Sequence, residues 1–370
     1  MTAPARRVVM SGMRPTGRLH IGHDWGVLKN WVALQESCDC YFAVADWHML
    51  TTGYEDTTRL VGDGREMVLD WLAAGVDPSR AVVFRQSDVT EHAELAVLLG
   101  MITPLSWLEN NPTWKEQLQE LARTKHSIAA ASSSAPPNRA GETVLDSERE
   151  SADLALRTHG FLGYPVLQAA DILLYGADAV PIGQDQLPHL ELSREIARKF
   201  NSLYGGGKEV LREPKPLLTP TPKVPGLDGR KMSKSYGNAI DIFESAESLS
   251  SKVRSAYTDP TRARATDPGH PEPCPENPPG CTVYALHKLY SAHWEKRGAE
   301  CRAGQIGCVA CKKDLLASME PVFADFRKRR EAFASEPGRV EAILAEGREK
   351  AKAAAGRTLS TVRRAMGLRS

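Results

Sequence analysis

The stretch Ser11-Gly-Met-Arg-Pro-Thr-Gly-Arg-Leu-His-Ile-Gly-His23 decides the fold of this 370-residue chain. It follows Arg7-Val-Val-Met10, a β-branched run that predicts a first buried strand, and it precedes an amphipathic helical pattern that includes Leu28 and Trp31. The stretch is therefore a strand-to-helix turn. Its glycines let the backbone approach a ligand closely, and the first turn of the helix offers unpaired N–H groups to an anion.

His20 and His23 give this turn its chemical character. Side chains three residues apart at the start of a helix share a face, so both imidazoles can point toward one phosphate. We interpret the turn as a nucleotide site. A glycine-rich turn with two surface histidines is the alternative that the turn alone leaves open.

A second polar stretch lies far downstream, at Gly226-Leu-Asp-Gly-Arg-Lys-Met-Ser-Lys-Ser-Tyr-Gly-Asn238, and we call it the lysine loop. In it Lys231 and Lys234 lie three apart, and Ser233 and Ser235 flank the second lysine. Two flexible ammonium groups suit a polyphosphate whose charge must be stabilised while it leaves. We expect a mobile loop with this task, although the composition alone is also typical of solvated surface.

Together the two stretches are more specific than either is alone. His20-Ile-Gly-His23 and Lys231-Met-Ser-Lys-Ser235 resemble the two nucleotide-binding motifs of the class I aminoacyl-tRNA synthetases, and both motifs are complete. The resemblance implies an aminoacyl-tRNA ligase that uses ATP as a substrate. It also implies that the two histidines and the two lysines of these motifs are its catalytic residues.

Composition and charge limit the other interpretations. Lys and Arg number 47 against 46 Asp and Glu, which gives a net charge of +1, so any tRNA must meet a local patch and we expect no DNA partner. Apolar residues, at 42%, suffice for one large domain and a smaller one. The chain shows no signal-peptide core and no membrane-spanning run, so we expect a cytoplasmic protein with reduced thiols.

Strand and helix patterns alternate through the first part of the chain. Buried strands are predicted at 40–46, 81–85 and 178–182, with helical patterns around 60–72, 95–99 and 160–175. This alternation predicts an α/β fold with a Rossmann-like, doubly wound parallel sheet, whose ligands bind at the carboxyl ends of the strands. His48 and Asp185 fall at such ends, and Asp185 is placed to accept hydrogen bonds from ribose hydroxyls.

The helical pattern at 160–175 is strongly apolar, yet it holds Gln168 and Asp171 on one face. A carboxylate there is costly to bury unless it is paired or meets a donor on a ligand. We expect Asp171 to meet a ligand. A capping or salt-bridged Asp inside the fold is the alternative.

Two changes of composition divide the chain. Residues 124–150 begin as a Ser/Ala/Pro-rich run and predict a disordered insertion within a catalytic domain that spans 1–258, with a role as a lid as the alternative. After this domain the sequence is rich in Pro and Gly to about residue 280 and then returns to helical patterns. We therefore predict a separate helical domain at 259–370, which the resemblance makes an anticodon-binding domain.

Longer runs narrow the resemblance. Gly12-Met-Arg-Pro-Thr-Gly17, Asp46-Trp-His-Met-Leu-Thr51 and Val180-Pro-Ile-Gly-Gln-Asp-Gln186 are similar to the bacterial tryptophanyl-tRNA synthetases. The resemblance implies that Asp171 accepts the indole N–H of L-tryptophan and that His48 and Gln168 line the same pocket. It implies an ATP site made of Arg14, Pro15, Thr16, Gly22, His23, Gly183, Gln184, Asp185, Val224, Lys231, Met232, Ser233, Lys234 and Ser235. Arg14 departs from the family, where Gln is usual, but its guanidinium can still meet a phosphate or a carboxylate.

The resemblance also implies the reaction. The tryptophan carboxylate attacks the α-phosphorus of ATP, pyrophosphate leaves, and the amino acid then passes to the 3′-terminal ribose of tRNA(Trp). Positioning and cations, Mg²⁺ among them, carry this chemistry. Family members are homodimers, and we expect the same here.

Three alternatives stay open at this point. Asp171 could accept from a tyrosine hydroxyl as readily as from an indole, so a tyrosyl-tRNA synthetase is one of them. An enzyme that activates an aromatic acid without loading tRNA is the second. The third is a synthetase paralogue that senses tryptophan or redox state.

Four cysteines of the helical domain form a metal-ligand pattern, Cys281, Cys301, Cys308 and Cys311, with gaps of 19, 6 and 2 residues. Four thiolates complete either a tetrahedral zinc (Zn²⁺) site or a 4Fe–4S cluster, and burial without a ligand is a further alternative. Some tryptophanyl-tRNA synthetases carry a similar C-x22-C-x6-C-x2-C pattern that binds a 4Fe–4S cluster. By that resemblance Cys281, rather than Cys274, is the first ligand, and the cluster orders the anticodon-reading helices.

The same domain carries the clearest basic concentration of the chain, Arg327-Lys-Arg-Arg330 together with Arg363 and Arg364. Such a run suits tRNA phosphates. A solvated helix face is the alternative.

Overall fold

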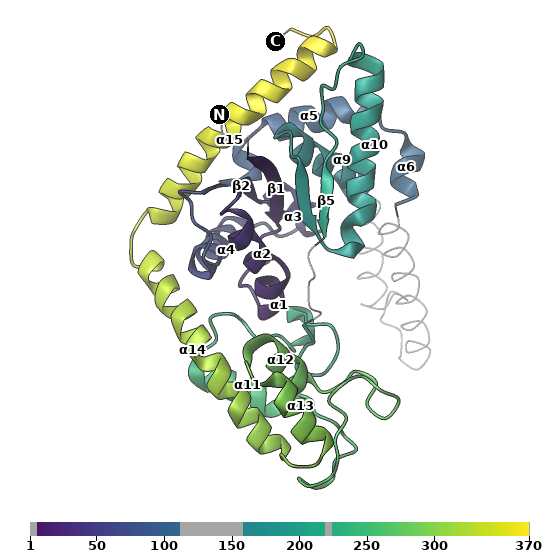
Figure 1. Cartoon of the computed structure of the whole chain (residues 1–370). Coiled ribbons are helices and arrows are strands. Elements are labelled where there is room, and N and C mark those ends of the chain that lie inside the picture. The colour runs from purple at the N-terminus through teal and green to yellow at the C-terminus, as the bar shows by residue number, and fades with distance from the viewer. Residues whose placement is uncertain (1–5, 112–157, 219–223, 370) are drawn as a thin grey trace, which may run out of the picture.

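The computed structural model describes residues 6–111, 158–218 and 224–369. The insertion expected at 124–150 lies outside the described residues. Within them the core of the molecule is a five-stranded sheet in the order β3-β2-β1-β4-β5 (Figure 1). Its strands are β1 (Arg7–Met13), β2 (Cys38–Val44), β3 (Ala81–Arg85), β4 (Ala179–Ile182) and β5 (Lys215–Leu218).

All pairings in this sheet are parallel, which confirms the predicted fold class. Val9 of β1 pairs with Cys40 on one side and with Ala179 on the other. The strand order therefore reverses direction between β1 and β4, and open parallel sheets bind their ligands at such a switch point.

The helices cover both faces of the sheet. They are α1 (Ile21–His23), α2 (Lys29–Leu34), α3 (Asp46–Gly53), α4 (Leu60–Ala74), α5 (Glu91–Gly100), α6 (Leu105–Glu109), α9 (His159–Leu174), α10 (Leu187–Tyr204), α11 (Ala246–Ser255), α12 (Thr282–Tyr290), α13 (Trp294–Arg302), α14 (Cys308–Ala334) and α15 (Arg339–Ala365). Short turns of 3₁₀ helix lie at η2 (Gln86–Asp88), η3 (Gln184–Gln186) and η4 (Lys234–Tyr236), and a π-helical turn, η1, at Asp24–Leu28.

Side chains of successive strand residues enter two different cores, as the period of two in a strand requires. Val9 and Val83 pack with α2 and α4 in one core, and their neighbours Met10 and Phe84 pack with α5, α9 and α10 in the other. Helix α15 contributes to both cores, its first half to the former and its second half to the latter. It therefore crosses the sheet at β3 and covers that edge, which leaves no open strand there for another chain to pair with.

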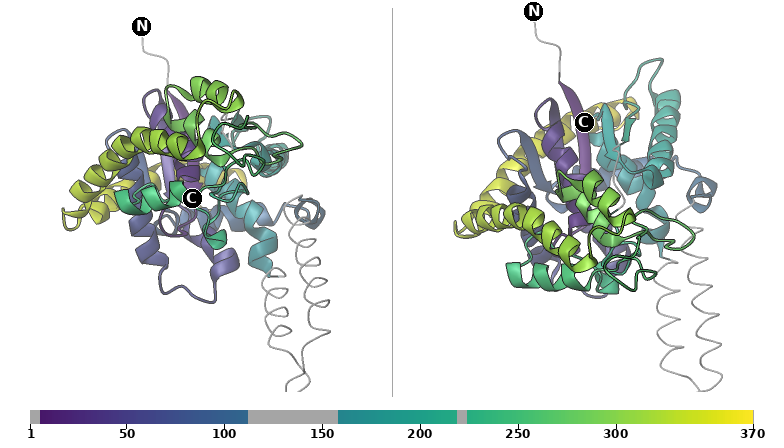
Figure 2. Two further views of the ribbon diagram at one scale, coloured as in Figure 1. Left: turned by 90° about the horizontal axis from the view of Figure 1, so that it is seen from below. Right: turned by 60° about the horizontal axis from the view of Figure 1, so that its bottom comes forward.

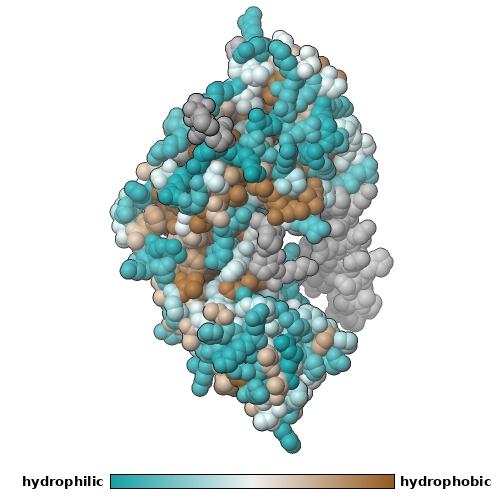
Figure 3. Space-filling view, viewed as in Figure 1, coloured by the Kyte–Doolittle hydropathy of each residue, from teal (hydrophilic) through white to brown (hydrophobic). Residues whose placement is uncertain are grey.

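Helices α11, α12, α13 and the first half of α14 form a lobe below the sheet (Figures 1 and 2). We call it the lower lobe. Its visible surface is largely hydrophilic, whereas apolar side chains gather nearer the sheet (Figure 3). Helix α14 leaves this lobe to pack on α4, and α15 continues along the sheet. The domain boundary at residue 258 stays a prediction.

The structure differs from the sequence prediction most at three strands. Strand β2 spans Cys38–Val44 rather than 40–46, and Asp46 already belongs to α3. Strand β1 runs on to Met13, three residues further than predicted, because Ser11, Gly12 and Met13 pair with β2 through Val44. Strand β5 was not predicted at all. It is short, partly exposed and carries Pro216, a residue that edge strands tolerate because one side of the strand needs no N–H donor.

None of the helices in the described ranges combines the length and the apolarity that crossing a bilayer requires.

A pair of glycines on α15 tests the packing of this helix on the sheet. A Cβ added to Gly347 would lie 1.8 Å from the Val83 carbonyl oxygen, whereas a Cβ on Gly356 meets no atom within 4 Å. We expect Gly347→Ala to lower the free energy of unfolding by about 3 kcal/mol or more, because backbone must move to relieve the clash. Gly356→Ala should raise it by about 0.5–1 kcal/mol, since alanine favours the helix. Thermal and urea unfolding measure both, and equal effects of the two variants would contradict this packing.

Candidate active site

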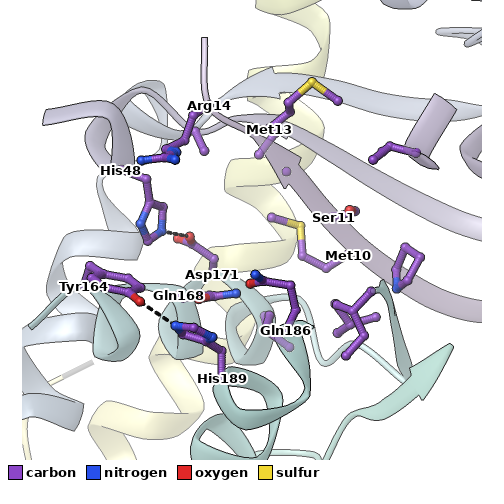
Figure 4. Close-up of a pocket in the computed structure, with 18 of the residues that line it drawn as sticks. Met10, Ser11, Met13, Arg14, His48, Tyr164, Gln168, Asp171, Gln186 and His189 are labelled. Atoms are coloured by element: carbon purple, nitrogen blue, oxygen red, sulfur yellow. Dashed lines mark hydrogen bonds and ion pairs between the residues drawn. The ribbon is translucent and has the colours of Figure 1, made fainter. Parts of the chain in front are cut away.

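A cavity of about 470 Å³ opens at the carboxyl ends of β1 and β4, at the switch point of the sheet (Figure 4). Gly12 and Arg14 line it from the end of β1, and Gly183 from the end of β4. Side chains of α3, α9 and α10 close its sides. Figure 4 shows Arg14 and His48 at one end of this cavity and Gln186 and His189 at another.

Asp171 of α9 is the charged centre of the cavity wall and is only 7% exposed. Its Oδ2 lies 2.8 Å from Nε2 of His48, and its Oδ1 lies 2.6 Å from Nδ1 of His92. The Nε2 of Gln86 donates to both oxygens, at 2.8 and 2.9 Å. Asp171 is thus held by three side chains, and it still faces the cavity.

The ionisation of Asp171 follows from these partners. Burial alone would raise its pKa, but the charge and hydrogen bond of His92 and the hydrogen bond of His48 outweigh burial and hold the pKa at about 2. The group is therefore a carboxylate at neutral pH and only accepts hydrogen bonds. A ligand donor that enters the cavity meets an oriented acceptor.

The structure brings together the three residues that the sequence assigned to this pocket, His48, Gln168 and Asp171. Sequence reasoning missed Gln86 and His92, which are fully buried behind Asp171. His92 is held on its other side by Tyr175, whose hydroxyl lies 2.7 Å from Nε2. Gln86 directly follows β3, so the same end-of-strand argument that selected His48 could have found it.

Another wall of the cavity is formed by Tyr164 and His189. The Tyr164 hydroxyl and Nε2 of His189 are hydrogen-bonded (Figure 4). Tyr164 lies on α9, and His189 lies on α10, which follows β4. They complete the polar lining around an otherwise apolar space, as is typical of pockets for small organic ligands.

The turn with the two histidines lies at the start of α1. His20 is the N-cap of this helix, and its Nδ1 accepts from the Gly22 N–H at 3.1 Å, while Nδ1 of His23 accepts from the His20 N–H at 3.2 Å. A Cβ on Gly22 would lie 2.8 Å from the His20 ring, so this position requires glycine. The two imidazole centroids are 3.8 Å apart, as the three-residue spacing predicted.

Both imidazoles are neutral at physiological pH. Burial, together with the charge of the nearby Lys234, lowers the pKa of His20 to about 4 and that of His23 to about 3. They therefore act as hydrogen-bonding groups there rather than as cations.

The lysine loop lies against this turn. Nζ of Lys234 donates to the Thr16 carbonyl at 2.9 Å, and burial lowers the pKa of this lysine. Met232 is buried in the core, and its sulfur comes within 4.0 Å of a Cβ placed on Gly22. Lys231 is exposed. Both predicted lysines are thus exposed, and Lys234 contacts the turn through its hydrogen bond to Thr16.

A short antiparallel bridge fixes the two motifs together. His20 pairs with Asp241, with hydrogen bonds of 2.9 Å from the Ile21 N–H to the Ile240 carbonyl and of 3.0 Å from the Ile242 N–H to the Leu19 carbonyl. This bridge begins three residues after the lysine loop ends, so it anchors the loop beside the helix N-terminus.

Asn238 holds the lysine loop in its folded shape. Its Oδ1 accepts from the Ser233 N–H at 2.8 Å, and its Nδ2 donates to Asp228 at 2.8 Å and to the Lys231 carbonyl at 3.1 Å. Asn238 is 3% exposed, so these bonds compete with little water. Nothing in the sequence pattern singled this residue out.

The other predicted ATP residues lie around the same turn or at the end of β4. Arg14 and Thr16 are exposed, Pro15 is buried, and Val224 packs on the core just before the lysine loop. Gly183 lines the cavity, and Gln184 is exposed in η3. The side chains of Asp185 and Ser235 lie outside the described part of the structure.

A second buried carboxylate, Asp70 of α4, supports the histidine turn from behind. It is fully buried, and it accepts from the Leu19 N–H at 3.0 Å and from Nε of Arg330 at 2.8 Å. Burial raises its pKa to about 6, against the hydrogen bond from Arg330. Sequence reasoning overlooked Asp70, although an Asp between Leu69 and Trp71 on an apolar helix face carries the same indication that selected Asp171.

Three arginines of the basic run form ion pairs within the fold. Arg330 also pairs with Glu66, Arg327 with Glu320, and Arg363 with Glu94. Arg330 and Arg363 therefore join α14 and α15 to α4 and α5. Lys328 and Arg364 are exposed, and contact of this run with tRNA phosphates stays a prediction.

The four cysteines of the helical region converge where three helices meet. Cys281 is the N-cap of α12, Cys301 lies in α13, and Cys308 and Cys311 lie in the first turn of α14. Nη1 of Arg262 is 3.7 Å from the sulfurs of both Cys301 and Cys308. Cys274 lies in the preceding loop, on a turn with Asn277.

Comparisons with known proteins agree with this geometry. A model of the family "tRNA synthetases class I (W and Y)" matches residues 4–132 and 143–324. The tryptophan–tRNA ligases of Aquifex aeolicus and Thermotoga maritima are each 45% identical to this chain, over 97% of it and 99% of their own length. A structure of tryptophanyl-tRNA synthetase from Campylobacter jejuni with ADP and tryptophan is similar at a TM-score of 0.76 and 29% identity, over 98% of this chain and all of that one.

The parallel sheet, with a histidine turn and a lysine loop meeting at its switch point, is the Rossmann-like fold of a class I synthetase. The chain belongs to the class I tRNA synthetases for tryptophan and tyrosine and, within them, to the tryptophan–tRNA ligases.

The pKa of His23 leads to a pH dependence of stability. Between about pH 3 and 6.5 the unfolded chain binds a proton at this position that the folded chain does not, so the free energy of unfolding rises with pH, by up to about 1.4 kcal/mol per unit. Below this window both states are protonated, and above it neither is. We expect His23→Asn to reduce the slope between pH 5 and 6.5, as measured by urea unfolding at several pH values. Parallel curves for the variant and the wild type would contradict a lowered pKa.

Proposed function

We propose that this site activates L-tryptophan with ATP and then transfers it to tRNA(Trp). The family assignment makes the chain an aminoacyl-tRNA ligase, and its relatives are tryptophan–tRNA ligases over nearly their whole length. The observation that carries the proposal is the contact of Lys234 with Thr16, in the turn that follows β1, while the end of β1 also lines the cavity around Asp171.

In this proposal ATP binds along the histidine turn and the lysine loop. The neutral imidazoles of His20 and His23 hydrogen-bond phosphate oxygens. The backbone N–H groups of Ile21 and Gly22, which the sequence suggested for this task, are already engaged by the Ile240 carbonyl and by Nδ1 of His20. Lys234, supported on Thr16, stabilises the charge that develops on pyrophosphate, and Lys231 approaches from solvent. Arg14, Pro15, Thr16, Gly22, Gly183, Gln184, Asp185, Val224, Met232, Ser233 and Ser235 form the rest of the ATP site. Mg²⁺ neutralises charge on the phosphates when it is bound with ATP.

Tryptophan occupies the cavity at the switch point, with its indole N–H donating to Asp171. Gln86, His48 and His92 all donate to this carboxylate, which holds it as an oriented acceptor beside the cavity. A phenylalanine side chain has no donor and gains no hydrogen bond from Asp171, which disfavours its binding relative to tryptophan. His48 and Gln168 line the same cavity.

We assign a 4Fe–4S cluster to Cys281, Cys301, Cys308 and Cys311, with Zn²⁺ as the alternative. Within the described residues no three of these sulfurs lie within 4.8 Å of one another. A tetrahedral zinc ion draws its four sulfurs to about 4 Å apart, whereas an iron–sulfur cluster holds them wider. The Arg262 guanidinium beside two of the sulfurs suits the negative charge of a thiolate-ligated cluster. The bound cluster would order α12, α13 and α14 for tRNA.

Three further assignments follow from the family. The enzyme works in the cytoplasm, and its helical region at 259–370 reads the anticodon. It acts as a homodimer, for which Val97, Met101 and Leu105 of α5 and α6 supply exposed apolar side chains.

Measurements of ATP–pyrophosphate exchange test the ATP site and the tryptophan site separately. We expect tryptophan-dependent ATP–pyrophosphate exchange, with Lys234→Ala lowering kcat by about 100-fold because the leaving group loses a cation, at an almost unchanged KM for tryptophan. Asp171→Asn should raise the KM for tryptophan by about 100-fold, because it weakens the acceptor of the indole and disturbs the hydrogen bonds with His48, Gln86 and His92. The KM for ATP should stay near its wild-type value, since no residue of the ATP site is changed.

The matched control is Lys208→Ala, an exposed lysine beyond α10, which should exchange at the wild-type rate. Exchange with tyrosine as efficient as with tryptophan would contradict the specificity. Exchange with neither amino acid would contradict the activation step.

The iron content of cysteine variants tests the cluster. We expect protein purified without oxygen to hold about four iron atoms per chain, and Cys308→Ser or Cys281→Ser to lose most of them because each removes one ligand. Cys274→Ser should keep its iron. Retention of iron in Cys281→Ser together with loss in Cys274→Ser would make Cys274 the first ligand instead, and zinc in place of iron in the wild type would favour the alternative metal.

A further inference from the structure

The proline-rich segment that leads into the lower lobe brings three further metal-binding groups together. A ring nitrogen of His270, the sulfur of Cys274 and a carboxylate oxygen of Glu276 lie within 4.8 Å of one another. Among the described residues, no other three His, Cys, Asp or Glu side chains bring their ligand atoms this close together. It belongs neither to the cavity around Asp171 nor to the four cysteines at the helix ends.

The histidine of this group is oriented by a buried carboxylate. Oδ2 of Asp259 lies 2.9 Å from Nδ1 of His270, and the same oxygen accepts from the His270 N–H. Asp259 is only 5% exposed. Histidines that bind metals almost always donate their other ring nitrogen to a carboxylate or a carbonyl, which fixes the tautomer and the direction of the ring. Because Asp259 engages Nδ1, Nε2 is the nitrogen available to an ion.

The backbone around the group is rigid before any ion binds. Cys274 and Asn277 exchange two backbone hydrogen bonds of 3.1 Å, which closes a tight turn with Glu276 inside it. The side chain of Asn277 is fully buried, donates to the His270 carbonyl at 2.8 Å and accepts from the Tyr257 hydroxyl at 3.0 Å. The two segments that carry the three ligands are thus joined by a buried amide, so little ordering entropy is lost when an ion binds.

We propose that His270, Cys274 and Glu276 bind one divalent transition-metal ion, for which Zn²⁺ is the best match. Nitrogen, sulfur and oxygen ligands together suit zinc, with bonds of about 2.0–2.3 Å, so the ligand atoms need to approach to about 3.5 Å. Rotations of the exposed Glu276 side chain and the half-buried Cys274 side chain supply this movement. Three protein ligands leave the fourth tetrahedral position for water.

The ion would stabilise a segment that contacts both the four-cysteine region and the lysine loop. Gly269 donates its N–H to the Cys301 carbonyl at 3.0 Å, beside the four cysteines. On its other side the Tyr257 N–H donates to the Leu227 carbonyl at 2.7 Å, and Pro279 lies 3.2 Å from a Cβ placed on Gly229 of the lysine loop. A zinc ion here would therefore stabilise the connection between the lysine loop and the lower lobe.

Zinc stoichiometry on the full-length protein tests the proposal. The chain is purified without oxygen with its four-cysteine site filled, washed with EDTA, and titrated with ZnCl₂ against a chromophoric chelator. We expect the wild type to bind one equivalent of zinc. His270→Gln and Cys274→Ala should lose that equivalent, and Glu276→Gln should bind it at least tenfold more weakly. Matched controls are His293→Gln and Glu295→Gln, exposed residues of the same region that should bind zinc as the wild type does.

Cobalt gives an independent readout. Co²⁺ in the wild type should show a sulfur-to-metal charge-transfer band of one thiolate, absent from Cys274→Ala but present in both controls. The exposed Glu276→Gln variant keeps the test valid if a substitution at His270 disturbs folding. Absence of zinc binding by the wild type, or equal binding by the wild type and the site variants, would overturn the proposal. So would loss of iron on substitution of Cys274, since that thiol would then belong to the cluster.

Discussion

The carboxylate of Asp70 is the contact on which the arrangement of the active site depends. It lies fully buried on α4 and accepts hydrogen bonds from the backbone ahead of His20 and from the guanidinium of Arg330. The first bond fixes where the chain turns from the sheet into α1. The second fixes where α14 packs against α4. Removing one partner would leave a buried charge or donor unsatisfied, which is far more costly than losing an exposed ion pair.

Helix α14 connects this contact to the region of the four cysteines. Cys308 and Cys311 lie in its first turn and Arg330 near its last, about 33 Å further along a continuous helix. Its middle packs on α11 and α12, which connects it to the segment after the lysine loop. Two of the cysteines and the arginine that holds Asp70 behind the histidine turn therefore lie on the same helix. Arg330, which belongs to the basic run in the sequence, is engaged within the fold by this contact.

Two of the buried carboxylates, Asp171 and Asp70, show how different surroundings give similar residues different roles. Asp171 has three side-chain donors, which keep its pKa at about 2, whereas Asp70 has a single cation and a single N–H donor, and burial raises its pKa to about 6. The sequence indicated Asp171, because a carboxylate on an apolar helix requires a partner. It did not reveal Gln86 or His92, since these donors come from the turn after β3 and from α5, far away in the chain.

The sequence by itself determined the alternation of strands and helices, the histidine turn, the lysine loop and the spacing of the four cysteines, because these depend on local periodicity, glycine positions and motif chemistry. It missed β5, whose four residues carry no apolar alternation. Only the tertiary structure decided that Lys234 donates to the Thr16 carbonyl and that Arg330 pairs with Asp70. It likewise decided that Asn238 hydrogen-bonds across the lysine loop. Each of these contacts joins segments or atoms whose approach depends on how the helices pack, and no local pattern encodes that packing.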